Sequence, residues 1–100
     1  MTPIRWTDGA RADLRAIHAY VARDSRVYAR RLVDRIRKSV LRLRKFPESG
    51  GRVLEWDRPD VREIPVGNYR AIYRLRNNTV EILTVIHGAR LLSDQAEDYF

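Results

Sequence analysis

The spacing of apolar residues divides the chain into a helical half and a strand half. Apolar side chains recur three or four positions apart between Thr7 and Asp24 and again between Ser25 and Phe46, which predicts two amphipathic helices. Thr7 or Asp8 can cap the first helix and Ser25 the second, because their side chains accept hydrogen bonds from free backbone N–H groups. The break between the helices is very short, so we expect an antiparallel hairpin. The predicted buried stripes are Ala10, Leu14, Ile17 and Val21, and Ala29, Leu32, Val33, Ile36, Val40 and Leu43. The polar residues expected to face away from the core in the first helix are Arg11, Asp13, Arg15 and Arg23.

From Pro47 onward the pattern alternates with a period of two, which is typical of strands. Gly67-Asn68 and Asn77-Asn78 separate the last strands, and these residue types tolerate the positive φ angles that tight hairpin turns require. The predicted strands are Arg52–Trp56, Val61–Val66, Tyr69–Leu75 and Thr79–Ile86, and the N-terminus is also strand-like. The sequence therefore predicts an α+β fold in which an N-terminal strand and a helical hairpin precede an antiparallel sheet packed on the helices.

The last hairpin allows its register to be predicted. If Asn77-Asn78 is a two-residue loop, side chains alternate between the two faces of the paired strands. The expected helix-facing pairs are Leu75–Val80, Tyr73–Ile82, Ala71–Thr84 and Tyr69–Ile86. The expected pairs on the opposite face are Arg74–Glu81, Ile72–Leu83 and Arg70–Val85, with His87 just beyond them. We therefore expect Arg70, Arg74 and His87 to project together from the face away from the helices.

The positive charge is concentrated in one segment. The whole chain has a net charge of +7, but residues 23–45 contain ten basic side chains and only two acidic ones, a local +8 that leaves −1 for the rest. Such a surface attracts nucleic acid or an acidic protein segment, although it can also be a solvated helix face. The basic helix face consists of Arg30, Arg31, Arg35, Arg37, Lys38, Arg42, Arg44 and Lys45.

Length and composition limit the class of protein. One hundred residues suffice for one domain, so we expect residues 1–100 to form a single unit with a tail at 91–100. That acidic tail can form a short Ser93-capped helix against the domain or remain disordered. No apolar run approaches the roughly 18 residues of a membrane span, no signal peptide is visible and cysteine is absent. We expect a cytoplasmic protein without a membrane association.

Three interpretations of the strand arginines and His87 remain open. Arg74 and Glu81 can form a cross-strand ion pair while Glu63 screens Arg70, which gives these residues a purely structural role. The same side chains can bind a macromolecule without catalysis. They can also cleave RNA, with arginines stabilising phosphorane charge and His87 supplying acid–base chemistry. The sequence predicts no metal site and no cofactor, since His18 and His87 are the only histidines.

Four short stretches occur in a characteristic order over residues 4–90. They are Trp6-Thr7…Ala10…Asp13-Leu14; Phe46-Pro47-Glu48-Ser49-Gly50; Arg62-Glu63-Ile64…Tyr69-Arg70-Ala71-Ile72-Tyr73; and Val80–Arg90, which ends in His87-Gly88-Ala89-Arg90. Together with the order of predicted elements, they resemble the RelE/ParE superfamily of bacterial toxins from type II toxin–antitoxin systems of the plasmid stabilisation type. The resemblance implies a growth-inhibiting toxin.

The resemblance favours one of two branches. The Phe46–Gly50 stretch, the long second helix and the His87–Arg90 ending resemble ParE toxins, which are associated with non-catalytic inhibition of DNA gyrase. The alternative is a RelE-like, ribosome-dependent mRNA endonuclease, in which Arg70 would occupy the catalytic strand position and Arg90 a second basic position. The basic cluster that such nucleases carry before the central strands is not evident here. The candidate target-binding or active surface is therefore Arg70, Arg74, His87 and Arg90, with no catalytic role assigned.

The resemblance also implies a protein partner. Toxins of this superfamily are neutralised by a small antitoxin whose flexible C-terminal segment folds on binding. An acidic segment with apolar side chains would suit the basic helix and a groove between helices and sheet. We expect a cognate antitoxin, a possible toxin–antitoxin hetero-oligomer, and either DNA gyrase or the ribosome with its mRNA as the target.

Overall fold

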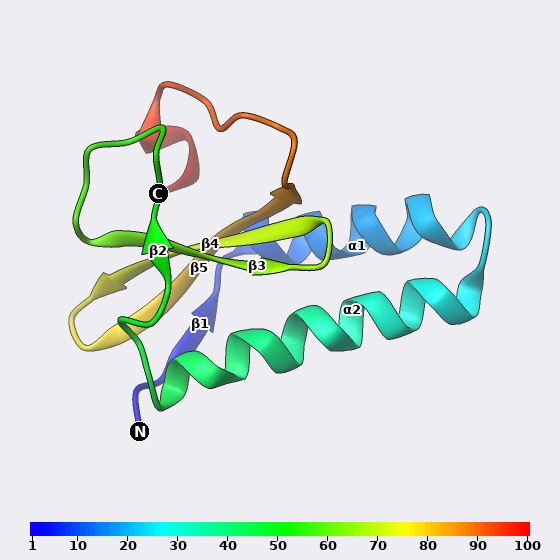
Figure 1. Cartoon of the computed structure of the whole chain (residues 1–100), viewed down its shortest axis with the longest axis horizontal. Coiled ribbons are helices and arrows are strands. Elements are labelled where there is room, and N and C mark those ends of the chain that lie inside the picture. Colours follow the sequence, from blue (N-terminus) through cyan, green and yellow to red (C-terminus); the bar gives the residue numbers. More distant parts are fainter.

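A computed structural model describes all residues from 1 to 100, arranged as a helical hairpin beside a five-stranded sheet (Figure 1). The helices are α1 (Asp8–Ala22) and α2 (Arg26–Leu41), and α2 continues into a 3₁₀ turn at Arg42–Arg44. The strands are β1 (Ile4–Trp6), β2 (Gly51–Arg52), β3 (Val61–Val66), β4 (Tyr69–Arg76) and β5 (Thr79–His87), and a 3₁₀ turn at Ala96–Tyr99 lies near the C-terminus. This order confirms the predicted α+β arrangement. None of the helices is both long and apolar enough to cross a bilayer.

The helix caps are as predicted, and so are the buried stripes, except that Ile17 and Val21 of α1 are only partly buried. Thr7 Oγ1 accepts a hydrogen bond from Ala10 N at 3.1 Å, and Ser25 Oγ accepts one from Tyr28 N at 3.1 Å. All the predicted apolar residues of α2 and its 3₁₀ extension are buried. Asp13 was predicted to face away from the core, and that prediction is wrong. Its carboxylate accepts hydrogen bonds from the Thr84 hydroxyl and, at 3.0 Å, from Val85 N, so it ties α1 to β5.

The strands after the helices form the predicted antiparallel sheet, and the N-terminal strand joins it in parallel, so the sheet as a whole is mixed. Its strand order is β1-β5-β4-β3-β2, with β1 parallel to β5 and all other neighbours antiparallel. The helical hairpin carries the chain from β1 to β2 at the opposite edge of the sheet, and the strands β2 to β5 then bring it back beside β1, where β5 runs parallel to β1. The prediction of a strand over Arg52–Trp56 is also wrong beyond Arg52. The chain turns there, and Val53 and Trp56 are buried against the sheet instead of extending it.

The β4–β5 hairpin contains a bulge that changes its register halfway along. Asn77 and Asn78 have φ angles of 52° and 56°, which confirms the predicted two-residue turn. The pairs next to this turn are also as predicted, but Ile72 pairs with Thr84 because Leu83 is an extra residue on β5. Beyond this bulge the pairs are Ala71–Val85, Arg70–Ile86 and Tyr69–His87, one position away from the prediction.

The stretch after α2 is fixed by a buried tyrosine. Tyr73 Oη accepts a hydrogen bond from Gly50 N at 3.0 Å and donates one to Pro47 O at 2.8 Å. A Cβ atom at Gly50 would lie only 2.5 Å from Tyr73 Oη and 2.8 Å from Glu63 O. The Pro47–Gly50 segment therefore needs glycine at its end because the sheet approaches it so closely.

Two apolar clusters lie on opposite faces of the sheet. The larger one, between sheet and helices, contains Ala10, Leu14, Leu32, Ile36, Val40, Leu43, Ile64, Val66, Ala71, Tyr73, Val80, Ile82 and Val85. The smaller one contains Val53, Trp56, Val61, Ile72, Leu83, Ile86 and Leu92. Residues 53–60 and the C-terminal tail form its outer wall, and we call these two segments the cover. In Figure 1 they lie next to each other, on the far side of the sheet from α2.

Candidate functional site

Arg70 lies on the sheet face opposite the helices, where it is held by two carboxylates. Its Nη1 donates hydrogen bonds to Glu55 Oε1 at 3.1 Å and to Glu63 Oε2 at 2.8 Å. Its Nη2 donates to the other oxygen of Glu55 and, at 2.9 Å, to the carbonyl oxygen of Arg90. Only 13% of the Arg70 side chain is exposed. The guanidinium therefore links the cover to the sheet and presents little surface to a ligand.

The contact with Arg70 also sets the ionisation of Glu55. Hydrogen bonds from the Arg70 guanidinium lower the pKa of the Glu55 carboxyl from 4.5 to about 2, against the opposing effect of burial. The same contact, with Glu55 as the leading cause, raises the pKa of Arg70 above its ordinary value. The pair is fully ionised at neutral pH and stabilises the cover electrostatically.

Acid should weaken this contact in a defined pH range. Because the pKa of Glu55 is lower in the folded state, its stabilisation is complete above pH 4.5 and is lost as the pH falls toward about 2. We expect a loss of up to about 3 kcal/mol in the free energy of unfolding over that range. Urea unfolding of the wild type and of Glu55→Gln at several pH values measures it. Parallel pH profiles for the two proteins would contradict the prediction.

Arg74 is also held by a carboxylate, four residues farther along β4 and on the same face as Arg70. Its Nε donates to Glu81 Oε1 at 3.0 Å, which confirms the predicted cross-strand pair, and Arg5 of β1 also contacts the Glu81 carboxylate. Burial alone would raise the pKa of Glu81, but hydrogen bonds from Arg5 and Arg74 outweigh it and lower the pKa. The Phe100 ring lies 4.3 Å from the Arg74 guanidinium carbon, so the tail closes over this arginine.

The cover itself is held by aromatic and polar contacts. Trp56 Nε1 donates to Ser93 O at 2.9 Å, and the Trp56 ring lies 5.4 Å from Tyr99 and 6.1 Å from Phe100, measured between ring centroids. The tail thus packs on the domain and contains a 3₁₀ turn. Of the two predicted alternatives, a short helix against the domain and a disordered tail, the structure has the first. Ser93 is not the helix cap itself; its hydroxyl accepts from Gln95 N and donates to Asp98. The expectation of a freely accessible arginine face is wrong because this cover lies over it.

His87 does not share a face with Arg70, contrary to the prediction. The bulge at Leu83 pairs His87 with Tyr69, and their rings lie 5.4 Å apart on the helix-facing side of the sheet edge. His87 Nδ1 accepts a hydrogen bond from Ala89 N at 3.1 Å, and the ring is exposed. Both His87 and Arg70 border a pocket of about 500 Å³ at this end of the sheet. Arg90 is exposed and forms no ion pair.

The basic face of α2 is exposed as predicted, and none of its cations forms an ion pair. Asp34, which lies four residues from both Arg30 and Lys38, forms no ion pair with either of them. The face divides into two flanks on either side of Asp34. Arg30, Arg37 and Arg44 border α1 and β1, whereas Arg31, Arg35, Lys38 and Arg42 border the β3–β4 turn.

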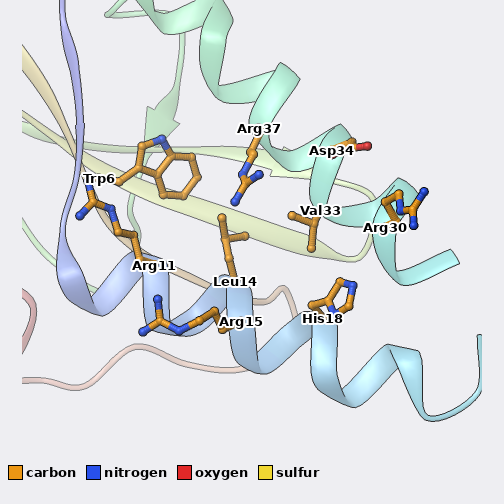
Figure 2. Close-up of a pocket in the computed structure, with 9 residues that line it drawn as sticks. All are labelled: Trp6, Arg11, Leu14, Arg15, His18, Arg30, Val33, Asp34 and Arg37. Atoms are coloured by element: carbon orange, nitrogen blue, oxygen red, sulfur yellow. The ribbon is translucent and has the colours of Figure 1, made fainter. Parts of the chain in front are cut away.

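A cleft between α1 and α2 was not predicted from the sequence. It has a volume of about 640 Å³, and Figure 2 shows Trp6, Leu14 and Val33 at its apolar centre. The charged and polar residues around this centre are Arg11, Arg15, His18, Arg30, Asp34 and Arg37. The sequence signal that could have predicted this cleft was the spacing of these residues, which lie at the margins of the apolar stripe of each helix. The cleft offers apolar contact and four arginines, which suits an acidic segment with apolar side chains.

Comparison with known proteins identifies relatives over most of the chain. The family described as "ParE toxin of type II toxin-antitoxin system, parDE" matches residues 4–92. A candidate toxin of Sinorhizobium fredii, Y4kP, is 40% identical over 87 residues, covering 85% of this chain and 86% of its own length. Among solved structures, the chromosomal ParDE toxin–antitoxin system of P. aeruginosa matches with a TM-score of 0.73 and 27% identity, over 87% of this chain and 96% of that chain. The RelBE2 toxin–antitoxin complex of Mycobacterium tuberculosis matches with a TM-score of 0.65 and 25% identity, over 86% and 96%.

Proposed function

Because this chain belongs to the ParE family of toxins from type II toxin–antitoxin systems, we propose that it inhibits growth by binding DNA gyrase in the cytoplasm, without catalysis of its own. A cognate antitoxin neutralises it, in a system of the plasmid stabilisation type. The observation that carries the choice of a binding mechanism is the engagement of Arg70 and Arg74. Both guanidinium groups already contact carboxylates beneath the cover, and only 13% and 11% of their side chains are exposed.

The electrostatics of this face argue against phosphate chemistry there. A catalytic arginine must point a free donor at the position where negative charge develops. At Arg70, an incoming phosphate would have to displace Glu55 or overcome its repulsion, and Glu63 lies 2.8 Å away on the other side. Two carboxylates around one guanidinium leave this site with a net negative charge. A non-catalytic contact surface fits these residues better than an active site.

The test is a supercoiling and cleavage assay with gyrase from the source organism. We expect purified toxin at micromolar concentration to block supercoiling or to accumulate cleaved DNA. Addition of the cognate antitoxin protein should reverse the effect. Full gyrase activity in the presence of micromolar toxin that still inhibits growth would rule the proposal out.

A second function is supported by specific observations. The RelBE2 complex has a similar fold, and exposed His87 and Arg90 lie near Arg70 at one end of the sheet. A ribosome-dependent mRNA endonuclease could use these side chains if the cover opened. Incubation with translating ribosomes and end-mapping of the message tests this function. Cleavage that disappears in His87→Ala and Arg90→Ala, with gyrase unaffected, would establish the alternative.

The inter-helical cleft is the proposed docking site of the antitoxin segment. We expect Arg30→Gln/Arg37→Gln to weaken antitoxin binding by about tenfold or more, because both guanidinium groups border the apolar centre of the cleft. Calorimetry with the purified antitoxin measures the change. The matched control is Arg35→Gln/Arg42→Gln, which removes the same charge from the other flank of α2 and should alter the affinity by less than about threefold. Equal losses in the two variants would argue against the cleft.

A further inference from the structure

The flank of α2 that borders the β3–β4 turn forms a straight row of free cations. Arg31, Arg35, Lys38 and Arg42 follow one another at intervals of four, three and four residues, so they lie on one side of the helix. With a rise of 1.5 Å per residue the row is about 16 Å long. All four side chains are exposed and none has an acidic partner. We call these four residues the basic row.

The surroundings of the basic row differ from those of the cleft. The hollow beside it, about 700 Å³, is lined otherwise by Asp34, Ser39, Pro65 and Val66, without an aromatic side chain. Arg35 reaches across to the β3–β4 turn, where a Cβ atom at Gly67 would lie 3.3 Å from Arg35 Nη1. The row therefore presents four cations with their hydrogen-bond donors, beside Pro65 and Val66 on one side and beside Val27, Tyr28 and Leu32 at its Arg31–Arg35 end.

We propose that the basic row binds the phosphate backbone of duplex DNA. A folded peptide needs apolar anchors at the centre of its contact. The cleft has Trp6, Leu14 and Val33 at its centre, whereas the hollow beside the row has only Pro65 and Val66. Single strands are held by a series of aromatic side chains on which bases stack. None lines this hollow, and Tyr28 borders only the Arg31–Arg35 end of the row. A duplex carries one negative charge per roughly 1.7 Å of its axis, so a 16 Å row faces a dense array of phosphates. Three of the four cations are guanidinium groups, each of which can donate two parallel hydrogen bonds to the oxygens of one phosphate.

The choice of DNA rests on the proposed function, since gyrase holds a DNA duplex, but the interaction with phosphates does not require gyrase. In the proposed arrangement the toxin contacts the enzyme and its DNA together. The antitoxin segment occupies the cleft on the other flank of α2, so the two partners use different arginines of one helix.

A fluorescence titration of the purified toxin with a labelled 20-base-pair duplex, without gyrase, tests the row. Four neutralised phosphates predict a slope of about −3.6 for the logarithm of the binding constant against the logarithm of salt concentration, or roughly a 150-fold loss between 50 and 200 mM. Arg35→Gln/Arg42→Gln should lower the slope by about 1.8 units and weaken binding at 50 mM salt by about tenfold. Arg30→Gln/Arg37→Gln, with the same charge change on the same helix, should stay within about threefold of the wild type.

Several outcomes would overturn the assignment. Absence of binding at 50 mM salt with 100 µM toxin, a concentration on the order of the weakest non-specific affinities, would do so. Equal losses in the two double variants would mean that only net charge matters. If the row variant weakens binding of a synthetic glutamate–leucine amphipathic peptide while DNA is not bound, the row belongs to a protein partner. Thermal melts of both variants should match the wild type, because all four substituted side chains are exposed.

Discussion

Arg70→Ala is expected to lower the free energy of unfolding by about 4 kcal/mol, in the range measured when one partner of a buried ion pair is removed. The substitution leaves Glu55 and Glu63 as neighbouring carboxylates beneath the cover, with 15% and 21% of their side chains exposed. It also removes the hydrogen bond to Arg90 O that fixes the start of the tail. Urea denaturation at pH 7 measures the loss.

The control for Arg70→Ala is Arg52→Ala, which removes an exposed ion pair with Asp57 and should change stability by less than about 0.5 kcal/mol. Adding Glu55→Gln to Arg70→Ala should restore part of the loss, since an amide carries no uncompensated charge yet still accepts from Leu92 N. An Arg70→Ala protein as stable as the wild type would contradict this structural role. Loss of activity in Arg70→Ala alone is therefore no evidence of catalysis unless the fold is shown to persist.

The helical half of the fold was predictable because its signal is local. A helix that packs on one side places its apolar residues three and four positions apart, and the stripe from Ala29 to Leu43 is buried throughout. The caps at Thr7 and Ser25 follow from side-chain chemistry next to the helix start. The parallel pairing of β1 with β5 could not be predicted in this way. It joins residues about 76 positions apart, and the three residues of β1 are too few to form a pattern that selects a partner strand.

The register of β5 could not be predicted beyond Ile82 because alternation is absent there. Residues 80–86 are all buried, since helices cover one face of the strand and the cover lies on the other. Either register would bury apolar side chains, so the pattern does not detect the extra residue at Leu83. The position of His87 depended on that one residue. An amphipathic strand shows its register through alternating polar and apolar residues, whereas a strand that is buried on both faces is apolar throughout and does not.

The cover left a signal that the prediction did not use. Ile72 and Leu83 were assigned to the outer face, where two neighbouring apolar residues would be unfavourable in water. Aromatic residues to shield them were present at Trp56, Tyr99 and Phe100. Their pairing with the sheet face joins segments far apart in the chain, which no local pattern reveals. Arg70 and Arg74 were correctly placed on that face, but their burial is a consequence of the cover.

Trp56→Ala is expected to destabilise the protein by about 4 kcal/mol, typical of removing a large buried aromatic side chain. The substitution deletes the ring that contacts Tyr99 and Phe100 and the hydrogen bond to Ser93 O. It leaves the contacts of Arg70 with Arg90 O and of Glu55 with Leu92 N in place. The tail should therefore detach only beyond Ser93.

Hydrogen exchange with peptide-level resolution can locate that boundary. In Trp56→Ala, amides of residues 96–100 should exchange as fast as an unfolded chain, because backbone bonds such as those from Asp98 N to Gln95 O and from Phe100 N to Glu97 O lie within the tail itself. The amide of Leu92 should remain protected by Glu55. Leu54→Ala is the matched control, since that side chain is 92% exposed in the same loop and should leave the exchange of the tail unchanged. Loss of protection at Leu92 together with 96–100 would mean that the cover opens as one unit, and that Arg70 and Arg74 are uncovered by the same event.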